Sequence, residues 1–435
     1  MNPKSLLSIA IALSFALLAQ AASLDRKAPL NVRDFGATGD GKTKDTAAFQ
    51  KALDTCAFAG GGAVVVPPGN YLIGGIHLSS YTTLRIEKDA TLTGSPDKED
   101  YPLMDVRWEG RWRQGHRALI YANHAQHIAL LGRGTIVGDP ALAFLRDPRG
   151  PALFEPIDCK DLRIEDLSFK YGRMWCIHLT YCENVLAKNL NIRSDKTKSN
   201  GDGIDIDSCK NVRVEKCDID TGDDAIAIKS GRGMEAVRIA RPCEDITIVD
   251  SSLGSAFAGV GIGTEMSGGV RNVRVERCSF PSGANAFFFK SRIGRGGFIE
   301  NVSAEDLDIG TTTFIGIDLL TKGIQDSEPV PGDNGIPRVD KINISKAKVH
   351  CKNLVVGANV PSEKPIDGFS LSDITGTCQK GITLANVIDA KLRGINVTGF
   401  SGPLLIINNV TGTGLENAVH GQATNAPANR PAQAP

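Results

Sequence analysis

A short β-prone element recurs along most of the chain, and this repetition sets narrow limits on the fold. Each copy places a polar residue, most often Asn or Asp, before an aliphatic residue and a run of alternating apolar and polar positions. Copies begin at His127, Asp161, Asn184, Asn211, Asp245, Asn272 and Asn301, with weaker ones at Lys341, Gly368 and Lys391. Neighbouring copies lie 23 to 40 residues apart without alternating helices, which is typical of a solenoid. We therefore predict an all-β fold, a right-handed parallel β-helix; a leucine-rich repeat would show a fixed leucine skeleton, which is missing.

One helix is expected, at the start of the solenoid. The Ala, Phe and Leu positions between Asp45 and Cys56 have helical spacing, and Asp45 is suited to cap the helix start. This segment predicts a short N-terminal capping helix, with little helix elsewhere. The 47 glycines and the low aromatic content of 6% suit a fold with many tight turns.

The N-terminus has the features of an export signal. A basic start at Lys4 precedes an apolar run from Leu6 to Leu18 and an Ala-Gln-Ala end. We predict that residues 1–21 are a secretory signal peptide and that the protein is secreted or periplasmic. A membrane anchor is the alternative, although the run is short for crossing a bilayer.

The rest of the chain is predicted to be one domain with a tail. Residues 22–415 form the predicted β-helix domain, and residues 416–435, rich in Ala, Pro, Asn and Gln, form a predicted disordered tail. The 49 basic and 49 acidic residues balance, which argues against a nucleic-acid or anionic-membrane partner. We expect a monomer.

Most cysteines follow the phase of the repeat. Two sets recur at fixed distances from the aliphatic position: Cys159, Cys182, Cys209 and Cys243 before it, and Cys217 and Cys278 after it. Stacked side chains have parallel Cβ directions about 4.8 Å apart, which is long for a relaxed disulfide. We predict buried free thiols at these six positions and place any disulfide among the others, Cys56, Cys176, Cys351 and Cys378.

Three carboxylates are expected to meet on one surface. Asp202 stands just before one strand-like segment, and Asp223 and Asp224 stand just before the next, about one repeat later. Equivalent points on neighbouring coils are about 4.8 Å apart. At such a short distance, two ionised carboxylates repel each other unless one of them holds a proton. A protonated acid beside ionised bases is the arrangement that glycoside hydrolysis requires. The alternative is that these acids only solvate turns, as Asp205 and Asp207 would.

Several segments together resemble a known family. Trp175-Cys-Ile-His178 looks like a W-x-I-H strand, Asn200-Gly-Asp-Gly-Ile-Asp like an N-T-D-G-I-D segment, and Gly222-Asp-Asp-Ala-Ile-Ala-Ile-Lys-Ser-Gly like G-D-D-x-I-A-I-K-S-G. Ile262-Gly-Thr-Glu-Met-Ser-Gly-Gly-Val is similar to I-G-S-E-M-S-G-G-V. By these motifs the chain, from Asn31 to about residue 320, resembles the polygalacturonase-like pectinases of glycoside hydrolase family 28. The resemblance implies a single-stranded, pectin-lyase-like solenoid.

The resemblance also implies site residues. Asp223 would be the general acid of an inverting hydrolase, and Asp202 and Asp224 would position and deprotonate the water. An inverting pair is expected to lie about 6.5–9.5 Å apart. We place Asn200 and His178 among the substrate-binding residues, with a structural, hydrogen-bonded role for His178 as an equal alternative.

Two family positions differ here. Ala256-Phe257-Ala258 stands where the family has G-H-G, and Phe288-Phe289-Lys290 stands where it has R-I-K. Phenylalanine neither moves a proton nor pairs with a carboxylate, but it stacks on the apolar face of a sugar. We therefore expect a changed leaving-group pocket, with Phe257, Phe288 and Lys290 contacting a neutral +1 sugar such as rhamnose. Only Phe288 of the Phe run is expected to point outward.

Positive charge near this pocket has two further candidate sources. Arg292 and Arg295 follow Lys290 and would replace the missing arginine, while Lys229 would neutralise the acid cluster. A polar–aromatic loop at Trp108–His116 would either contact carbohydrate or pack down. We find no His, Cys and acid spacing typical of a metal site and expect no cofactor.

The sequence thus predicts an exported inverting glycoside hydrolase. Its expected substrate is a galacturonic-acid-containing pectic polysaccharide or oligosaccharide cleaved at α-glycosidic bonds, including rhamnogalacturonan or another chain with a non-uronic +1 sugar. A catalytically inactive carbohydrate-binding β-helix is one alternative, because the family His and Arg are replaced. A pectate-lyase-like enzyme is the second. Endo or exo action stays open.

Overall fold

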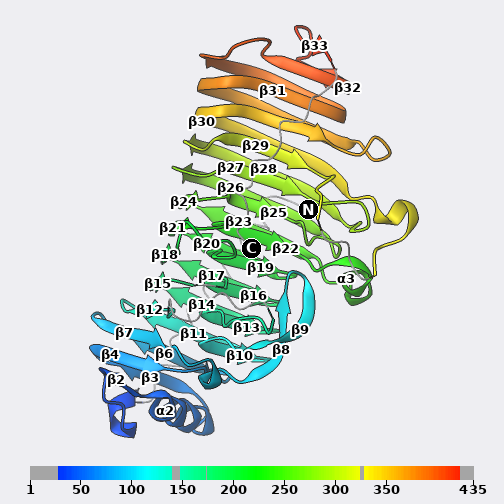
Figure 1. Ribbon diagram of the computed structural model, residues 1–435. Coiled ribbons are helices and arrows are strands. Elements are labelled where there is room, and N and C mark those ends of the chain that lie inside the picture. Colours follow the sequence, from blue (N-terminus) through cyan, green and yellow to red (C-terminus); the bar gives the residue numbers. More distant parts are fainter. Residues whose placement is uncertain (1–27, 140–146, 173, 324–327, 422–435) are drawn as a thin grey trace, which may run out of the picture.

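The computed structural model describes residues 28–139, 147–172, 174–323 and 328–421. The chain winds into a right-handed parallel β-helix, as predicted, with successive coils stacked from the blue N-terminal end to the red C-terminal end (Figure 1). The predicted signal peptide, residues 1–21, lies outside the described residues. Within the described part of the chain, no helix has the length and apolar character that a bilayer crossing requires.

Each coil contributes strands to three parallel ladders. The first face contains β5 (Ile76–His77), β10 (Ile120–Asn123), β13 (Phe154–Ile157), β16 (Ile177–Thr180), β19 (Ile204–Asp207), β22 (Ile226–Lys229), β25 (Ala258–Ile262), β27 (Asn285–Lys290) and β29 (Thr313–Asp318). The second contains β1 (Leu30–Asn31), β3 (Gly62–Val66), β6 (Thr82–Ile86), β11 (Gln126–Gly132), β14 (Lys160–Glu165), β17 (Glu183–Lys188), β20 (Lys210–Glu215), β23 (Cys243–Val249), β26 (Val270–Phe280) and β28 (Phe298–Ile309).

The third face is made of shorter strands. It contains β2 (Asp40–Lys44), β4 (Gly69–Ile73), β7 (Ala90–Gly94), β12 (Thr135–Val137), β15 (Ser168–Lys170), β18 (Asn191–Arg193), β21 (Asp218–Thr221) and β24 (Ser252–Ser255). The last coils are formed by longer strands, β30 (Arg338–Asn359), β31 (Ile366–Thr398), β32 (Leu405–Thr413) and β33 (Val419–His420). Strand β33 pairs with β32 and lies beyond residue 415, where the sequence placed the start of the tail.

The polar residue that opens each repeat has a backbone reason. Asn184, Asn211 and Asn272 have φ of 58°, 54° and 57°, in the left-handed region that Asn tolerates better than most side chains. Their amides also form a ladder between coils: Asn211 Nδ2 donates to Asn184 Oδ1 at 2.8 Å, and Asn184 Nδ2 donates to Asp161 Oδ1 at 2.9 Å. The recurring Asn and Asp therefore make the turn between the first two faces.

The interior is a continuous apolar core along the solenoid axis, built from the inward residues of all three faces. The six cysteines of the two repeat positions are buried free thiols, as predicted. Small side chains are favoured there because stacked coils leave little lateral room.

Helices close and flank the coil stack. The predicted N-terminal helix is α2 (Thr46–Phe58), which lies at the blue end of the stack (Figure 1). The capping prediction for Asp45 is wrong, because its side chain accepts hydrogen bonds from Thr38 and Gly39 and leaves the helix start uncapped. A second helix, α3 (Gly233–Ile239), follows β22 and was not predicted. Short 3₁₀ turns span Val32–Phe35, Lys98–Asp100 and Gly332–Gly335.

An antiparallel hairpin leaves the coil stack. Strands β8 (Leu103–Trp108) and β9 (Arg111–His116) form it, and they come from the polar–aromatic loop of the sequence analysis. In Figure 1 the cyan hairpin rises beside the first face toward α3.

Candidate active site

Three aspartates meet at the start of strands β19 and β22 on the first face. Ile204 and Ile226 are register partners, and Asp202 and Asp224 each stand two residues before them. Gly203 N–H donates to the carbonyl of Asp224, which stacks the two segments directly. One carboxylate oxygen each from Asp202, Asp223 and Asp224 lies within 4.8 Å of the others. The chain thus brings together the acids that the sequence placed one coil apart.

Asp223 is the most exposed of the three and is held rigidly. Its Oδ2 accepts the backbone N–H of Asn200 at 2.9 Å, and its Oδ1 accepts the N–H of Asp224 at 3.0 Å. The hydroxyls of Thr221 and Ser255 both donate to its carbonyl. Asn200 therefore contributes its backbone, at φ 61°, to the position of Asp223.

Asp202 is almost completely buried, at 3% exposure. Burial raises the pKa of its carboxyl well above the usual range, and the neighbouring Asp205, Asp223 and Asp224 carboxylates add to this, while Lys229 opposes it. Its Oδ1 has no hydrogen-bond partner among the described residues. A buried oxygen in this state is suited to bind a water molecule or a substrate hydroxyl.

Asp224 lies over a glycine of the next coil. A Cβ on Gly261 would come within 2.4 Å of Asp224 Oδ2, so only glycine leaves room for the carboxylate. Lys290 Nζ pairs with the same Oδ2 at 2.8 Å. Burial raises the pKa of Asp224 to about 6, and the charge of Asp223 raises it as well, against the lowering effect of Lys290.

The replaced family positions form an aromatic support for Lys290. The ring centroids of Phe257 and Phe288 lie 5.5 Å apart in an edge-to-face arrangement. Lys290 Nζ stands 4.7 Å from the Phe257 centroid and 5.6 Å from that of Phe288. Phe287 and Phe289 belong to the core, so the prediction that only Phe288 of this run points outward is confirmed.

A second lysine holds the other side of the acid cluster. Lys229 Nζ pairs with Asp205 at 2.6 Å, reaches Asp202 at 3.9 Å, and lies 4.0 Å from the Trp175 ring. Burial favours the neutral amine, but Asp205 and Asp202 outweigh it and raise the pKa of Lys229 well above its ordinary value. The neutralising contact expected for Lys229 is therefore present.

The idea that Asp205 and Asp207 merely solvate turns is wrong. Both are buried, at 0% and 1% exposure, on the outward side of β19. Asp205 pairs with Lys229, and Asp207 pairs with Arg107 of the hairpin at 2.7 Å. The reason is that β19 is covered by another part of the chain, which its own alternating pattern does not reveal.

His178 is enclosed in a buried polar network below the acids. Its Nδ1 is 2.9 Å from Glu155 Oε1 and its Nε2 is 3.2 Å from Thr180 Oγ1, at 1% exposure. Arg149 donates to both oxygens of Glu155. Burial opposes ionisation of Glu155, but Arg149 and His178 overcome it and lower its pKa to about 2. These contacts favour the structural alternative for His178.

The two arginines after Lys290 are nearly buried. Arg295 Nη1 donates to the Thr264 carbonyl at 3.2 Å and lies 3.7 Å from Glu265. Arg292 is 8% exposed, and its guanidinium lies beside Gly323. Neither is paired with the three aspartates in the described contacts.

Glu265 is a site residue that sequence reasoning passed over. Burial works against its ionised form, but Lys229, Arg295 and Lys290 together lower its pKa to about 2. It lies in the Ile262-Gly-Thr-Glu-Met segment that was used only to recognise the family. Its match to the family motif was the available signal.

The three aspartates are also close enough to ligate a hard cation. Two ammonium groups offset part of their charge, because Lys290 pairs with Asp224 and Lys229 reaches Asp202. The remaining negative charge is relieved if one carboxyl holds a proton, which fits an acid–base site.

Comparison with known proteins places this geometry in a family. The model of glycosyl hydrolases family 28 matches residues 56–413. A probable polygalacturonase of Vitis vinifera is 29% identical over 379 residues, covering 82% of this chain and 74% of the relative. A hyperthermoactive exopolygalacturonase from Thermotoga maritima has a TM-score of 0.77 at 27% identity, covering 86% of this chain and 93% of that one.

A second solved structure shares the fold. The family 28 exopolygalacturonase of Yersinia enterocolitica has a TM-score of 0.78 at 19% identity, covering 89% of this chain and 78% of that one. The family match spans most of the described coils and includes all three aspartates. The chain belongs to glycosyl hydrolases family 28 and is a glycoside hydrolase of the polygalacturonase-like, pectin-degrading kind.

Proposed function

We propose that the protein is an exported inverting hydrolase of α-glycosidic bonds in galacturonic-acid-containing pectic polysaccharide, acting as a monomer. The observation that carries this is the meeting of three carboxylates of unequal exposure, with Asp223 half-buried beside the buried Asp202 and Asp224. Three carboxylates this close together do not all ionise at once, so the cluster holds a proton that a general acid can donate.

Asp223 acts as the general acid that protonates the departing glycosidic oxygen. Two backbone N–H groups fix its carboxyl, and its exposure lets it reach a sugar bond above the first face. Asp202 and Asp224 hold and deprotonate the attacking water. One water that makes two hydrogen bonds of about 2.8 Å can bridge carboxylate oxygens that lie within 4.8 Å of each other.

The separation of the acids differs from the expected one. The nearest oxygens lie within 4.8 Å, whereas an inverting pair is expected at about 6.5–9.5 Å and a retaining pair at about 5–5.5 Å. Distance alone thus favours retention, and the proposal of inversion rests on the family resemblance and on a water held by two carboxylates. Product anomeric configuration by NMR decides the matter, since the α-anomer as first product would exclude inversion.

The leaving-group side is proposed to accept a neutral +1 sugar. Lys290 forms an ion pair with Asp224 and contacts two aromatic rings. Its charge is therefore already paired within the acid cluster and is less available for a substrate carboxylate. Phe257 is partly exposed and offers apolar surface that suits the face of a rhamnose ring, and the buried Phe288 supports it edge to face. Rhamnogalacturonan is therefore the substrate that we favour over homogalacturonan.

Two assays test the proposal. Rates on rhamnogalacturonan fragments and on polygalacturonate are compared, and a clear preference for polygalacturonate would refute the neutral +1 sugar. Asp223→Asn should lower kcat by about 10²–10⁴-fold while substrate binding persists. The second candidate is an inactive carbohydrate-binding protein, because the family His and Arg are replaced. Binding of these chains by the wild type without cleavage would favour it.

A further inference from the structure

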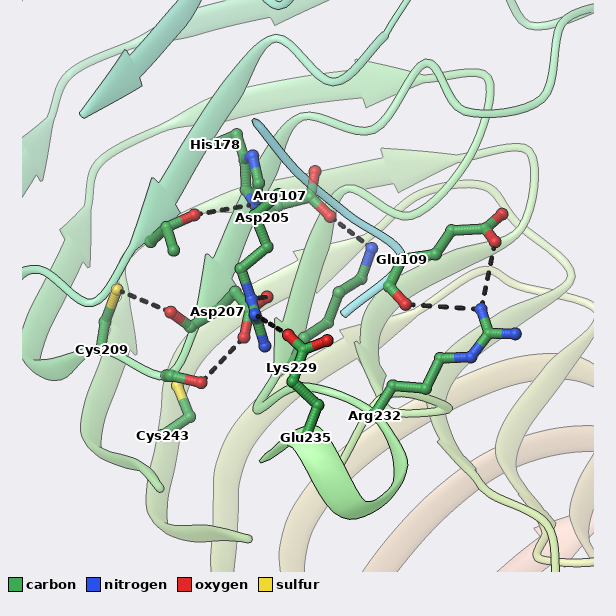
Figure 2. Close-up of polar contacts among 12 residues, drawn as sticks. Arg107, Glu109, His178, Asp205, Asp207, Cys209, Lys229, Arg232, Glu235 and Cys243 are labelled. Atoms are coloured by element: carbon green, nitrogen blue, oxygen red, sulfur yellow. Dashed lines mark hydrogen bonds and ion pairs between the residues drawn. The ribbon is translucent and has the colours of Figure 1, made fainter. Parts of the chain in front are cut away.

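Asp205 and Lys229 form a buried ion pair beside the three aspartates. Asp205 is 0% exposed and Lys229 is 6% exposed, and the ammonium lies 2.6 Å from the carboxylate. Figure 2 shows the lysine side chain extended toward Asp205. Asp202 is the next carboxylate, and its Oδ2 lies 3.9 Å from the same Nζ. The lysine is therefore about 1 Å too far from Asp202 for a charge-assisted hydrogen bond.

Neighbouring side chains hold Lys229 in this position. The centre of the Trp175 ring lies 4.0 Å from its Nζ, and the same ring packs edge-to-face against His178 at 4.6 Å. His178 is the register partner of Asp205 on the next coil, and its ring is fixed by the buried Glu155. A lysine that contacts a buried ring and pairs with a buried carboxylate has little freedom to turn toward Asp202.

Asp202 is therefore buried without a close countercharge. Lys229 is its nearest cation among the described ion pairs. Other cations of this region have closer partners: Lys290 with Asp224 at 2.8 Å, Arg107 with Asp207 at 2.7 Å and Arg149 with Glu155 at 2.7 Å. Besides Lys229, the titratable groups that face Asp202 are Asp205, Asp223, Asp224 and the thiol of Cys176. A buried carboxyl in such surroundings takes up a proton more readily than it stays ionised.

The two buried acids of the cluster differ in this respect. Asp202 and Asp224 are 3% and 1% exposed, and burial raises the pKa of both. Lys290 pairs directly with Asp224, whose pKa rises only to about 6. For Asp202, the neighbouring carboxylates add to the effect of burial and outweigh Lys229, so its pKa lies well above the ordinary value. The more distant lysine thus leaves Asp202 as the stronger proton acceptor.

We infer that Asp205 is a positioning residue: by holding Lys229, it allows Asp202 to store, in the free enzyme, the proton that Asp223 later donates. The inference rests on the proposed function and adds a separate role for Asp202 to it. Asp223 is half-buried and its described contacts include no ion pair, so it is the carboxyl that meets the sugar bond. Oxygens of Asp202 and Asp223 lie within 4.8 Å, a distance that one water bridges with two hydrogen bonds.

The stored proton closes the reaction cycle. In the free enzyme Asp202 is protonated, and Asp223 and Asp224 are ionised. When substrate binds, the proton passes through the bridging water from Asp202 to Asp223. Asp223 gives it to the glycosidic oxygen as the bond between that oxygen and the anomeric carbon breaks. The attacking water, oriented by Asp224, forms the new C–O bond and loses a proton to Asp202. This restores the starting state, with one water consumed and no proton taken from the solvent.

Infrared difference spectroscopy tests the storage site directly. At pH 7 the spectrum of the wild type minus that of Asp202→Asn should contain the C=O band of a protonated carboxyl, which shifts in D₂O. Absence of this band would overturn the inference and leave hydrolysis by the cluster intact. The measurement needs no turnover. If the wild type cleaves neither polygalacturonate nor rhamnogalacturonan, the proposed function fails, while the band still decides where the proton lies.

Kinetics test whether Asp205 acts through the lysine. The alkaline limb of kcat/KM reports loss of the acid proton from the free enzyme. Asp205→Asn releases Lys229 to pair with Asp202 and should move this limb to lower pH by about 1–3 units. Loss of the Asp205 charge contributes part of the shift, and the same substitution in a Lys229→Met background measures that part alone. Equal shifts in the two backgrounds would refute the positioning role.

Asp207→Asn is the matched control. Asp207 is also buried on β19, but it pairs with Arg107 of the hairpin. Its loss should leave the alkaline limb in place. A limb that moves as far as in Asp205→Asn would show that any buried charge on this strand has the same effect, which would contradict the inference. If circular dichroism shows that Asp205→Asn does not fold, the infrared comparison of the wild type with Asp202→Asn still decides whether Asp202 stores the proton.

Discussion

Lys290 Nζ lies 2.8 Å from Asp224 Oδ2 and thereby sets how easily that carboxyl loses its proton. Burial raises the pKa of Asp224 to about 6, and Lys290 is the largest influence that keeps it from rising further. The two phenylalanines that replace the family His and Arg position this lysine. The altered motif is thus consistent with a retuned acid–base pair as well as with a different sugar.

The first prediction concerns the pH profile. Activity needs Asp224 ionised, so kcat/KM should rise with pH through about 6. Lys290→Met removes a charge that lowers the Asp224 pKa, and the acid limb should move to higher pH by about 1–3 units. Lys290→Arg keeps the charge and should keep the limb near the wild-type value. An unchanged limb in Lys290→Met would show that Asp224 does not control the profile.

The second prediction concerns the glycine below Asp224. Gly261→Ala places a methyl group 2.4 Å from Asp224 Oδ2 and should displace the carboxylate, lowering kcat by about 10²-fold. The effect should vanish when Gly261→Ala is added to Asp224→Asn, because both changes act on the same group. A double-mutant cycle on kcat, with thermal unfolding as the control for folding, measures this. Equal losses in both backgrounds would mean that the methyl group acts elsewhere.

The repeat and the chemistry of the acids could be read from the sequence because both depend on local order. The turn residues recur as Asn or Asp since each adopts a left-handed φ, and a two-residue strand alternation placed Phe288 outward. Asp202 and Asp224 met because equivalent positions on adjacent coils must stack.

Contacts between distant segments could not be read in this way. Arg107 and Asp207 are 100 residues apart, and nothing near either residue announces the partner. The hairpin was visible only as a polar–aromatic loop with two open interpretations, and α3 is a seven-residue helix with a weak pattern. The ion pair that covers Asp207 comes from this hairpin, so the burial of the outward side of β19 was missed with it.

The third prediction concerns the stability of the acid cluster. The pKa of Asp202 is raised in the folded protein, so its protonated form stabilises the fold below the unfolded pKa of about 3.9, and this contribution is lost as pH rises through the folded pKa. Asp202→Asn imitates the protonated form at every pH. The melting temperature should therefore exceed that of the wild type by on the order of 2 °C at pH 7, with a smaller gain at pH 4.

A surface acid provides the control for this measurement. Asp389→Asn, in an exposed position of β31, should leave the melting temperature nearly unchanged at both pH values. A loss of stability in Asp202→Asn at pH 7 would show that the ionised carboxylate is held by favourable contacts, above all Lys229.

The fourth prediction concerns the asparagine ladder that turns the coils. Lys341 occupies the ladder position with φ 55°, yet it has no side-chain amide to place in the row. It follows Asn301 by one coil, since Val302 and Ile342 are register partners, and Asn301 already donates to Asn272 at 2.8 Å. Lys341→Asn relieves the left-handed strain and supplies a donor for Asn301, so the free energy of unfolding should rise by about 1 kcal/mol.

Two variants serve as controls. Asn211→Ala should lower the free energy of unfolding, because Ala at φ 54° is strained and the hydrogen bond to Asn184 is lost. Lys341→Gly, which relieves the strain without the amide, should fall between the wild type and Lys341→Asn in chemical denaturation. If Lys341→Gly equals Lys341→Asn, the ladder bond adds nothing, and the recurring Asn is explained by backbone conformation alone.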